Sequence, residues 1–264
     1  MTHYTIDGGQ PGKARLNVIA EMMRPTTASL LAAAGVPAGG HCLDVGCGGG
    51  HVSLDLARLV GPTGSVVGID LDAQILELAR SDATAAGVTN VTYRLGAADT
   101  LDGGPYDVAY ARFLLSHVGD PGGVVTAMTK VVTPGGVVIV EDIDDTACFC
   151  YPDSPAYRRS IELYRETVGL RGGNSGIGPA LPTRLRTAGL QSIGVNVVQP
   201  VALDGPFKLA AYLTLERIAT AVVDEGVATH AEVQELLAEL LVFIEDPTTL
   251  LSVPRIVQSW GFLP

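Results

Sequence analysis

Short apolar runs alternate with amphipathic stretches from about residue 40 to about residue 200. The runs have the length and β-branched content of buried strands, and they fall at 42–45, 65–70, 91–96, 106–111 and 137–140. After the first run, residues 51–59 repeat apolar side chains at the spacing of an amphipathic helix. This alternation is typical of a parallel sheet covered by helices on both faces, so the pattern predicts an α/β fold.

Three segments outside this alternation carry helical patterns of their own. One helix is predicted from about 14 to 23, and a second begins at Ser154-Pro155. The third segment holds a helix over 207–223 and another opened by the capping box Thr229-His230-Ala231-Glu232. Ligands of open α/β sheets bind beyond the carboxyl ends of the strands. We therefore interpret these helices as a lid over that edge, with a dimer surface or ordinary core packing as alternatives.

The junction between the first strand and the helix after it is rich in glycine. Asp44 is followed by Gly46, Gly48 and Gly50 in the pattern Asp-x-Gly-x-Gly-x-Gly. Glycine permits positive φ and lets a ligand approach the backbone, and the helix N-terminus offers unpaired N–H groups. The turn is therefore a candidate ligand site.

Two common phosphate-binding turns do not fit this junction. A dinucleotide fingerprint needs a glycine five residues after its first one, and those positions hold His51 or Ser53. A phosphate loop needs Gly-Lys-Ser/Thr at its end, and the junction has no lysine. The remaining pattern resembles the class I S-adenosylmethionine-dependent methyltransferases.

Further signals in the family's order support the resemblance. The strand at 65–70 ends in Asp70, about twenty residues after the turn, where a carboxylate can accept from both ribose hydroxyls. The next strand runs into Ala97-Ala98-Asp99, and Pro134-Gly135-Gly136 opens the strand at 137–140. The resemblance covers about residues 40 to 145. It points to the small-molecule enzymes, of the methyltransferase type 11/25 kind, that methylate quinones, sterols and specialised metabolites.

The resemblance implies a fold and a cofactor. We expect a Rossmann-like, seven-stranded, mostly parallel sheet whose last strand, at 255–261, is antiparallel, with helices on both faces and helical lid insertions. Residues 1–264 would form one domain, with an N-terminal helical segment (1–38), a cofactor-binding core (39–145), and lid helices with the last two strands (146–264). The expected cofactor is S-adenosylmethionine, bound by Asp44, Gly46, Gly48, Asp70, Leu71, Ala98, Asp99 and Arg112.

Two residues after the fourth strand are candidates for the chemistry. In similar methyltransferases these positions face the cofactor's methionine end and the acceptor pocket, so Arg112 is expected to bind the methionine carboxylate. His117 is the candidate base, because a histidine pKa of about 6.5 suits proton removal near neutral pH. A histidine that only orders the loop is the alternative.

Acids at the end of the fifth strand and nearby tyrosines are candidate substrate ligands. Carboxylates can bind a divalent cation, but the metal-dependent methyltransferases, which the chain resembles in fold, also have an acid at the end of the fourth strand. This chain has Tyr110-Ala111-Arg112 there, so no metal is expected. The expected substrate-binding residues are Tyr4, Asp142, Asp144 and Tyr157. The alternatives are carboxylates that fix a loop or are only solvated, and tyrosines that pack at the edge of the lid.

Net charge, cysteine spacing and hydrophobic runs limit the class of partner and the cellular compartment that we expect. The net charge of −11 argues against sequence-independent binding to nucleic acid. The four cysteines form no Cys-x-x-Cys pair, so we expect reduced thiols. The sequence has neither a basic-then-apolar leader nor an uncharged run long enough to span a bilayer. We expect a cytoplasmic protein with a small-molecule substrate, no membrane contact, and a homodimer as one option.

The expected activity is methyl transfer from S-adenosylmethionine to a carbon, oxygen or nitrogen atom of a small organic acceptor in specialised metabolism, by in-line displacement. The alternative keeps the cofactor without the transfer, as in members of this fold that act as cyclases or pericyclic catalysts. A non-catalytic binding protein is a third hypothesis.

Overall fold

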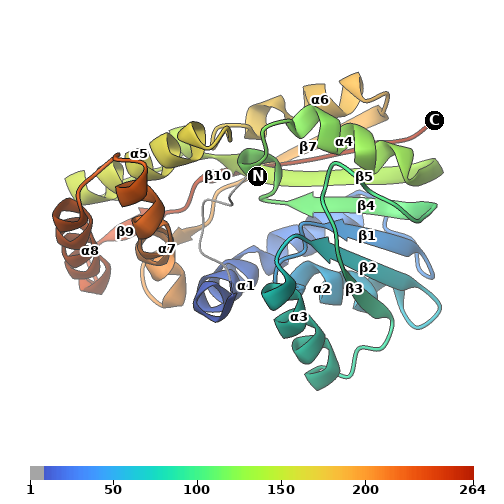
Figure 1. Ribbon diagram of the computed structural model, residues 1–264, viewed down its shortest axis with the longest axis horizontal. Coiled ribbons are helices and arrows are strands. Elements are labelled where there is room, and N and C mark those ends of the chain that lie inside the picture. Colours follow the sequence, from blue (N-terminus) through green and yellow to red (C-terminus); the bar gives the residue numbers. More distant parts are fainter. Residues whose placement is uncertain (1–8) are drawn as a thin grey trace.

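The computed structural model describes residues 9–264, and the surroundings of side chains from residue 12 (Figure 1). The strands of its main sheet are β1 (His41–Val45), β2 (Ser65–Asp70), β3 (Val91–Leu95), β4 (Tyr106–Arg112), β5 (Val132–Asp144), β7 (Gln191–Val198) and β10 (Arg255–Phe262). They are ordered β3-β2-β1-β4-β5-β10-β7. Strand β10 is antiparallel to both neighbours, and the other pairs are parallel. The Rossmann-like sheet with an antiparallel last strand is therefore confirmed.

Helices cover both faces of this sheet, and α4 and α6 lie on the opposite side from α2 and α3 (Figure 1). Their bounds are α2 His51–Val60, α3 Ala73–Ala85, α4 Pro121–Lys130 and α6 Leu181–Thr187. Successive strand residues face opposite sides. Cys42 packs in the cluster that contains α2, whereas Leu43 packs in the cluster that contains α4 and α6. Because both faces are buried, the strands need continuous apolar runs.

The N-terminal helix α1 (Gly9–Ala33) is longer than the predicted 14–23. It continues through Pro25, a residue that usually disrupts a helix because it lacks an N–H group. Leu30 and Leu31, after the proline, are buried in the cluster with β1 and α2. Tertiary packing of the second half therefore holds the helix together past the proline.

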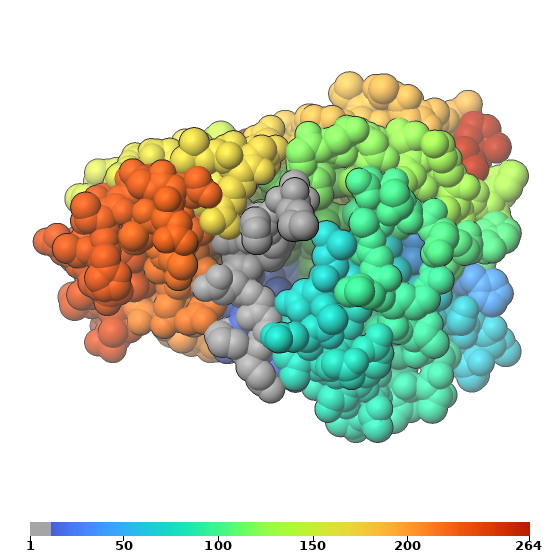
Figure 2. Space-filling view, viewed as in Figure 1, coloured from blue at the N-terminus to red at the C-terminus, as the bar shows by residue number. Residues whose placement is uncertain are grey.

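Three helices form a cap beyond the carboxyl ends of the parallel strands, seen at one end of the molecule in Figure 2. They are α5 (Pro155–Leu170), α7 (Ala210–Asp224) and α8 (His230–Glu245). The predicted helix at 207–223 begins instead with a 3-10 turn, Pro206–Leu209, before α7. Thr229 caps α8 by accepting from the Glu232 N–H (3.1 Å), as predicted. The Glu232 carboxylate accepts from Arg159 on α5 (3.0 Å) and so ties two cap helices together.

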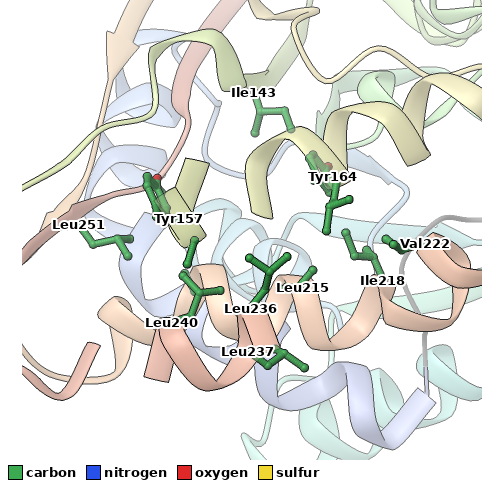
Figure 3. Packing of buried hydrophobic residues seen from close by; sticks show 14 of the residues in the cluster. Ile143, Tyr157, Tyr164, Leu215, Ile218, Val222, Leu236, Leu237, Leu240 and Leu251 are labelled. Carbon is green, nitrogen blue, oxygen red and sulfur yellow. The ribbon is translucent and has the colours of Figure 1, made fainter. Parts of the chain in front are cut away.

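The cap has its own apolar core, separate from the two faces of the sheet (Figure 3). Tyr164 from α5, Leu215 and Ile218 from α7, and Leu236 and Leu240 from α8 contribute to it. A three-stranded sheet ordered β6-β9-β8 adjoins the cap, and no sequence pattern predicted it. Its strands are β6 (Cys150–Tyr151), β8 (Val201–Ala202) and β9 (Leu250–Ser252).

No helix in residues 9–264 combines the length and the apolarity needed to cross a bilayer.

Candidate functional site

A cavity of about 980 Å³ lies where the sheet meets the cap. One end is walled by the glycine turn after β1 and by the residues that follow β2 and β3. The other end is walled by side chains from α1, α5 and α7, which are mostly apolar. Ligand pockets commonly have volumes of about 300 to 1,000 Å³, so this cavity has room for a cofactor and a small acceptor.

The glycine turn that forms the first wall needs glycine for both conformation and space. Gly46, Gly48 and Gly50 all have positive φ, a conformation that side chains other than glycine rarely adopt. A Cβ atom on Gly50 would also lie 2.8 Å from Cζ of Tyr93 and 3.0 Å from Cβ of Ala79. The turn therefore brings bare backbone to the cavity, as a closely approaching ligand requires.

Asp70 ties the end of β2 to this turn. Its Oδ2 atom accepts from the Gly48 N–H (2.9 Å), and its Oδ1 atom accepts from the Asp72 N–H (3.0 Å). Burial raises the pKa of Asp70, although the backbone donors oppose this effect. The carboxylate lines the cavity, and each oxygen can accept more than one hydrogen bond. It can therefore bind sugar hydroxyls while it holds the turn.

The neighbouring walls fit an adenine ring. Leu71 lines the cavity and is 66% exposed, so it offers an apolar face beside Asp70. Ala98 and Asp99 line the same end, where the Asp99 carboxylate can accept from an amino group. Two carboxylate acceptors beside apolar side chains match the hydroxyl and amino donors of an adenosyl group, whereas a pyrophosphate would be repelled by them.

Asp44 and Arg112 bring opposite charges to the bottom of the turn. Asp44 is 2% exposed and accepts from Ser53 Oγ (2.6 Å). Burial raises the pKa of Asp44 to about 6, although Ser53 and Arg112 act in the opposite direction. Arg112 Nη1 donates to Thr27 Oγ1 (3.4 Å). The structure thus brings all eight residues predicted to bind the cofactor to one cavity.

His117 stands at the other end of the same cavity. It ends the 3-10 turn Leu115–His117, which is fixed because the buried Asp142 carboxylate accepts from the Ser116 N–H (3.1 Å). Its Nε2 atom lies 3.3 Å from the hydroxyl oxygen of Tyr164. Burial, aided by the positive charge of Arg15, lowers the pKa of His117 to about 3. The imidazole is therefore neutral at pH 7.

The four residues predicted to bind the substrate do not share one environment in the structure. Tyr157 lines the cavity, but its hydroxyl donates to the Ser252 carbonyl (2.6 Å). Asp142 and Asp144 are buried and are not among the cavity-lining residues. Asp142 holds the His117 turn, and Asp144 pairs with Arg255 and accepts from Thr146 Oγ1 (2.6 Å). Tyr4 lies outside the described residues.

Glu141, the residue before Asp142, is completely buried, and its contacts indicate a structural role. Its carboxylate accepts from Tyr110 Oη, from Thr27 Oγ1 (2.8 Å) and from Gln258 Nε2 (2.8 Å). Within the described part of the chain, no group of three His, Cys, Asp or Glu side chains could hold a metal ion.

Arg15 is a cavity residue that sequence reasoning missed. It lies on α1, and its Nε atom donates to Thr214 Oγ1 on α7 (3.1 Å), 199 positions away. Both residues line the cap end of the cavity. The helical pattern of α1 could place Arg15 on a helix, but no local signal could predict which distant helix it would meet.

The fold and the cavity define a Rossmann-like protein that binds an adenosyl cofactor across the carboxyl ends of its strands. Residues 38–168 match the family model described as "Methyltransferase domain". The chain belongs to the class I S-adenosylmethionine-dependent methyltransferases.

Comparison with individual proteins agrees with this membership. The chain is 34% identical over 113 residues to the "Ubiquinone biosynthesis O-methyltransferase" of Xanthomonas axonopodis pv. citri, a match that covers 42% of this chain and 46% of the relative. The chain therefore spans about half the length of the curated relatives it matches.

Two solved structures share the fold across most of the chain. The YcgJ protein of Bacillus subtilis has a TM-score of 0.59 at 16% identity, with 89% of this chain and 97% of that chain covered. The cyclase SpnF has a TM-score of 0.53 at 17% identity, with 90% of this chain and 81% of that chain covered. At these identities the likeness concerns the fold alone.

Proposed function

We propose that this protein transfers a methyl group from S-adenosylmethionine to a carbon, oxygen or nitrogen atom of a small, largely apolar acceptor. The proposal depends on one observation. A single cavity joins the glycine turn and Asp70 at one end to the His117–Tyr164 pair beneath the cap at the other. A cofactor on the turn would place its reactive end toward the chamber that receives the acceptor.

The family's cofactor supplies a methyl group that is already activated by a positive sulfur atom, so the protein must mainly position the acceptor in line with it, at about 3 Å. In our proposal, Asp70 binds the ribose hydroxyls, Leu71, Ala98 and Asp99 hold the adenine, and Asp44 and Arg112 hold the methionine amino and carboxylate groups. Apolar residues of the cap exclude water from the chamber, which strengthens the interactions between charged groups inside it.

His117 is proposed as the proton acceptor when the attacking atom carries a proton. Its neutral imidazole has a lone pair available, and Tyr164 Oη lies within reach to pass the proton. The bond from the acceptor atom to hydrogen would break, with the proton moving to the imidazole. The freed electron pair would form the new bond to the methyl carbon while the methyl–sulfur bond breaks and leaves its electron pair on sulfur. Asp142 holds this base in place through the Ser116 N–H.

The acceptor we propose is a flat, hydroxylated ring. The cap end of the cavity is lined by apolar side chains that include Ile19, Phe113, Ile161 and Leu215, together with a smaller number of polar groups. This composition suits a ring that presents one hydroxyl to His117. The similarity to a ubiquinone O-methyltransferase supports such a substrate class.

We further propose a setting in specialised metabolism, a cytoplasmic location and a homodimer. All four cysteines are free, in keeping with a reducing compartment. Exposed apolar side chains on α8 (Leu241 and Val242) and on the edge strand β7 (Val195 and Val197) support self-association. Light scattering coupled to size-exclusion chromatography would test the dimer.

The activity is tested by incubating the protein with S-adenosylmethionine and hydroxylated aromatic compounds, followed by mass spectrometry. Methyl transfer predicts S-adenosylhomocysteine together with a product heavier by one methylene unit. An isomerised product with intact cofactor would instead identify the cyclase alternative. Absence of cofactor binding by calorimetry would reject both.

A further inference from the structure

Among residues 12–264, the acceptor end of the cavity has one fixed positive charge, and the side chains around it are mostly apolar. It is the guanidinium of Arg15, which comes from α1 and reaches α7. We propose that the acceptor carries an anionic group, a carboxylate in the simplest case, and that Arg15 binds it. This inference rests on the proposed function, and it adds the charge of the substrate to it.

The contact with Thr214 orients the guanidinium for such a ligand. Arg15 Nε donates to Thr214 Oγ1 (3.1 Å), and that hydroxyl in turn donates to the Ala210 carbonyl (2.7 Å). Because the Thr214 hydroxyl donates its proton to that carbonyl, its oxygen can only accept from the arginine. With Nε held, the plane of the guanidinium is fixed and its terminal nitrogens keep N–H donors for a bidentate ligand. Among residues 12–264, no carboxylate forms an ion pair with Arg15.

A second arginine, Arg112, lies at the opposite end of the cavity, so the two arginines can bind different ligands. The positive charge of Arg112 acts on the pKa values of Asp44 and His51, both beside the glycine turn. The charge of Arg15 acts on His117. Arg112 therefore lies near the methionine end, whereas Arg15 lies near the candidate base. An anion bound by Arg15 would accordingly belong to the acceptor and not to the cofactor.

The position of Arg15 also connects acceptor binding to the base. Its charge adds to burial in keeping the pKa of His117 low. Among the described residues, Tyr164 on α5 also lies near this histidine, and the buried Asp142 contacts the adjacent Ser116. An anionic acceptor on Arg15 would offset the positive charge and so raise the proton affinity of His117. The base would then be weak without the acceptor and stronger with it.

The test compares matched acids and amides as ligands of the protein saturated with S-adenosylhomocysteine. The probes are 3- and 4-hydroxybenzoate and their neutral amides, measured by calorimetry with the wild-type chain, Arg15→Gln, Arg15→Lys and Arg186→Gln. Arg186 is an exposed arginine on α6 outside the cavity and serves as the matched control. We expect at least one acid to bind about tenfold or more tightly than its amide. Arg15→Gln should abolish this preference, Arg15→Lys should keep part of it, and Arg186→Gln should leave it unchanged.

Separate measurements distinguish this inference from the proposed function. Wild-type and Arg15→Gln should bind S-adenosylmethionine equally, and the pKa of His117 from NMR titration should rise in Arg15→Gln and on adding the preferred acid to wild type. Weaker cofactor binding in Arg15→Gln without a change in the acid preference would assign Arg15 to the cofactor and overturn the inference. Equal binding of acids and amides, or no binding of any acid, would also overturn it. Loss of cofactor binding by the wild-type protein would instead reject the proposed function.

Discussion

The Nε2 atom of His117 lies 3.3 Å from the hydroxyl oxygen of Tyr164, and the two rings meet edge to face at 80°. His117 follows a strand of the sheet, whereas Tyr164 belongs to the cap. The contact therefore joins the two parts of the molecule at the acceptor end of the cavity. Because the pKa of His117 is lowered to about 3, its ring is neutral at pH 7 and is a weak base until a bound acceptor raises its proton affinity.

Replacing His117 by Gln should lower kcat by about 100-fold, the lower range for losing a general base, and should change cofactor affinity little. Steady-state kinetics and calorimetry with S-adenosylmethionine would measure the two effects. His230→Gln, at the exposed start of α8, is the matched control. Equal losses of turnover and cofactor affinity would place His117 in the cofactor site.

Tyr164→Phe keeps the ring but removes the hydroxyl that contacts His117, so kcat should fall by about tenfold. In the His117→Gln background the same change should have an effect of less than about twofold, because the pair acts as a unit. A double-mutant cycle on kcat measures this coupling. Additive effects would show that Tyr164 only lines the chamber.

Asp70→Asn should weaken binding of S-adenosylmethionine by about 1 to 3 kcal/mol, since it removes a charged acceptor of hydrogen bonds. The same change loosens the glycine turn, because Asp70 accepts from the Gly48 N–H. Calorimetry gives the affinity, and Asp204→Asn, at an exposed position, is the control. An unchanged dissociation constant would mean that Asp70 does not contact the ribose.

Cofactor binding should depend on pH through Asp44. Burial raises the pKa of Asp44 to about 6, so this carboxyl is protonated below pH 6. S-adenosylmethionine carries positive groups and favours the ionised form, so binding releases a proton. Affinity should be highest above pH 6 and should fall by up to about tenfold per unit below it. Calorimetry from pH 5 to pH 8 measures the profile, and Asp44→Asn should flatten it. A flat wild-type profile would contradict the assignment.

Gly50→Ala and Gly87→Ala separate conformational cost from lack of space. Both positions have positive φ, but a Cβ on Gly87, after the end of α3, has no neighbour within 4 Å, whereas a Cβ on Gly50 meets Tyr93 and Ala79. Gly87→Ala should lower the free energy of unfolding by about 1 to 2 kcal/mol. Gly50→Ala should lower it by about 1 to 3 kcal/mol more, because of overpacking. Urea denaturation compares them, and equal losses would show that the turn has room for a side chain.

Local patterns predicted the sheet well because both of its faces are buried. The strand at 65–70 has the predicted bounds, and the glycine turn follows β1 at the expected residues. Features that depend on distant partners were not predictable in the same way. The strands β6 and β8 are two residues long, too short to show a period, and they pair with a strand from a remote part of the chain.

The candidate site shows the same difference between features set by local sequence and features set by distant partners. The cofactor end is built from consecutive turns at the strand ends, so the eight residues that motifs predicted all line the cavity. The acceptor end is built from α1, α5 and α7, and its geometry depends on how separate helices pack. Asp142 and Asp144 illustrate the difference. Sequence position placed them near the pocket, but their carboxylates face partners within the protein, Ser116 and Arg255.

Two successive residues of α1 reach different parts of the cavity. Leu16 lies against the glycine turn, with its Cδ1 atom 3.8 Å from where a Cβ of Gly48 would be, and Arg15 contacts the cap at Thr214. A nucleoside seated on the turn would press on the same helical turn that positions the guanidinium. A ligand on the glycine turn would then reduce the conformational entropy that is lost when a second ligand binds to Arg15. The methyl donor and the acceptor should consequently each bind more tightly when the other is present.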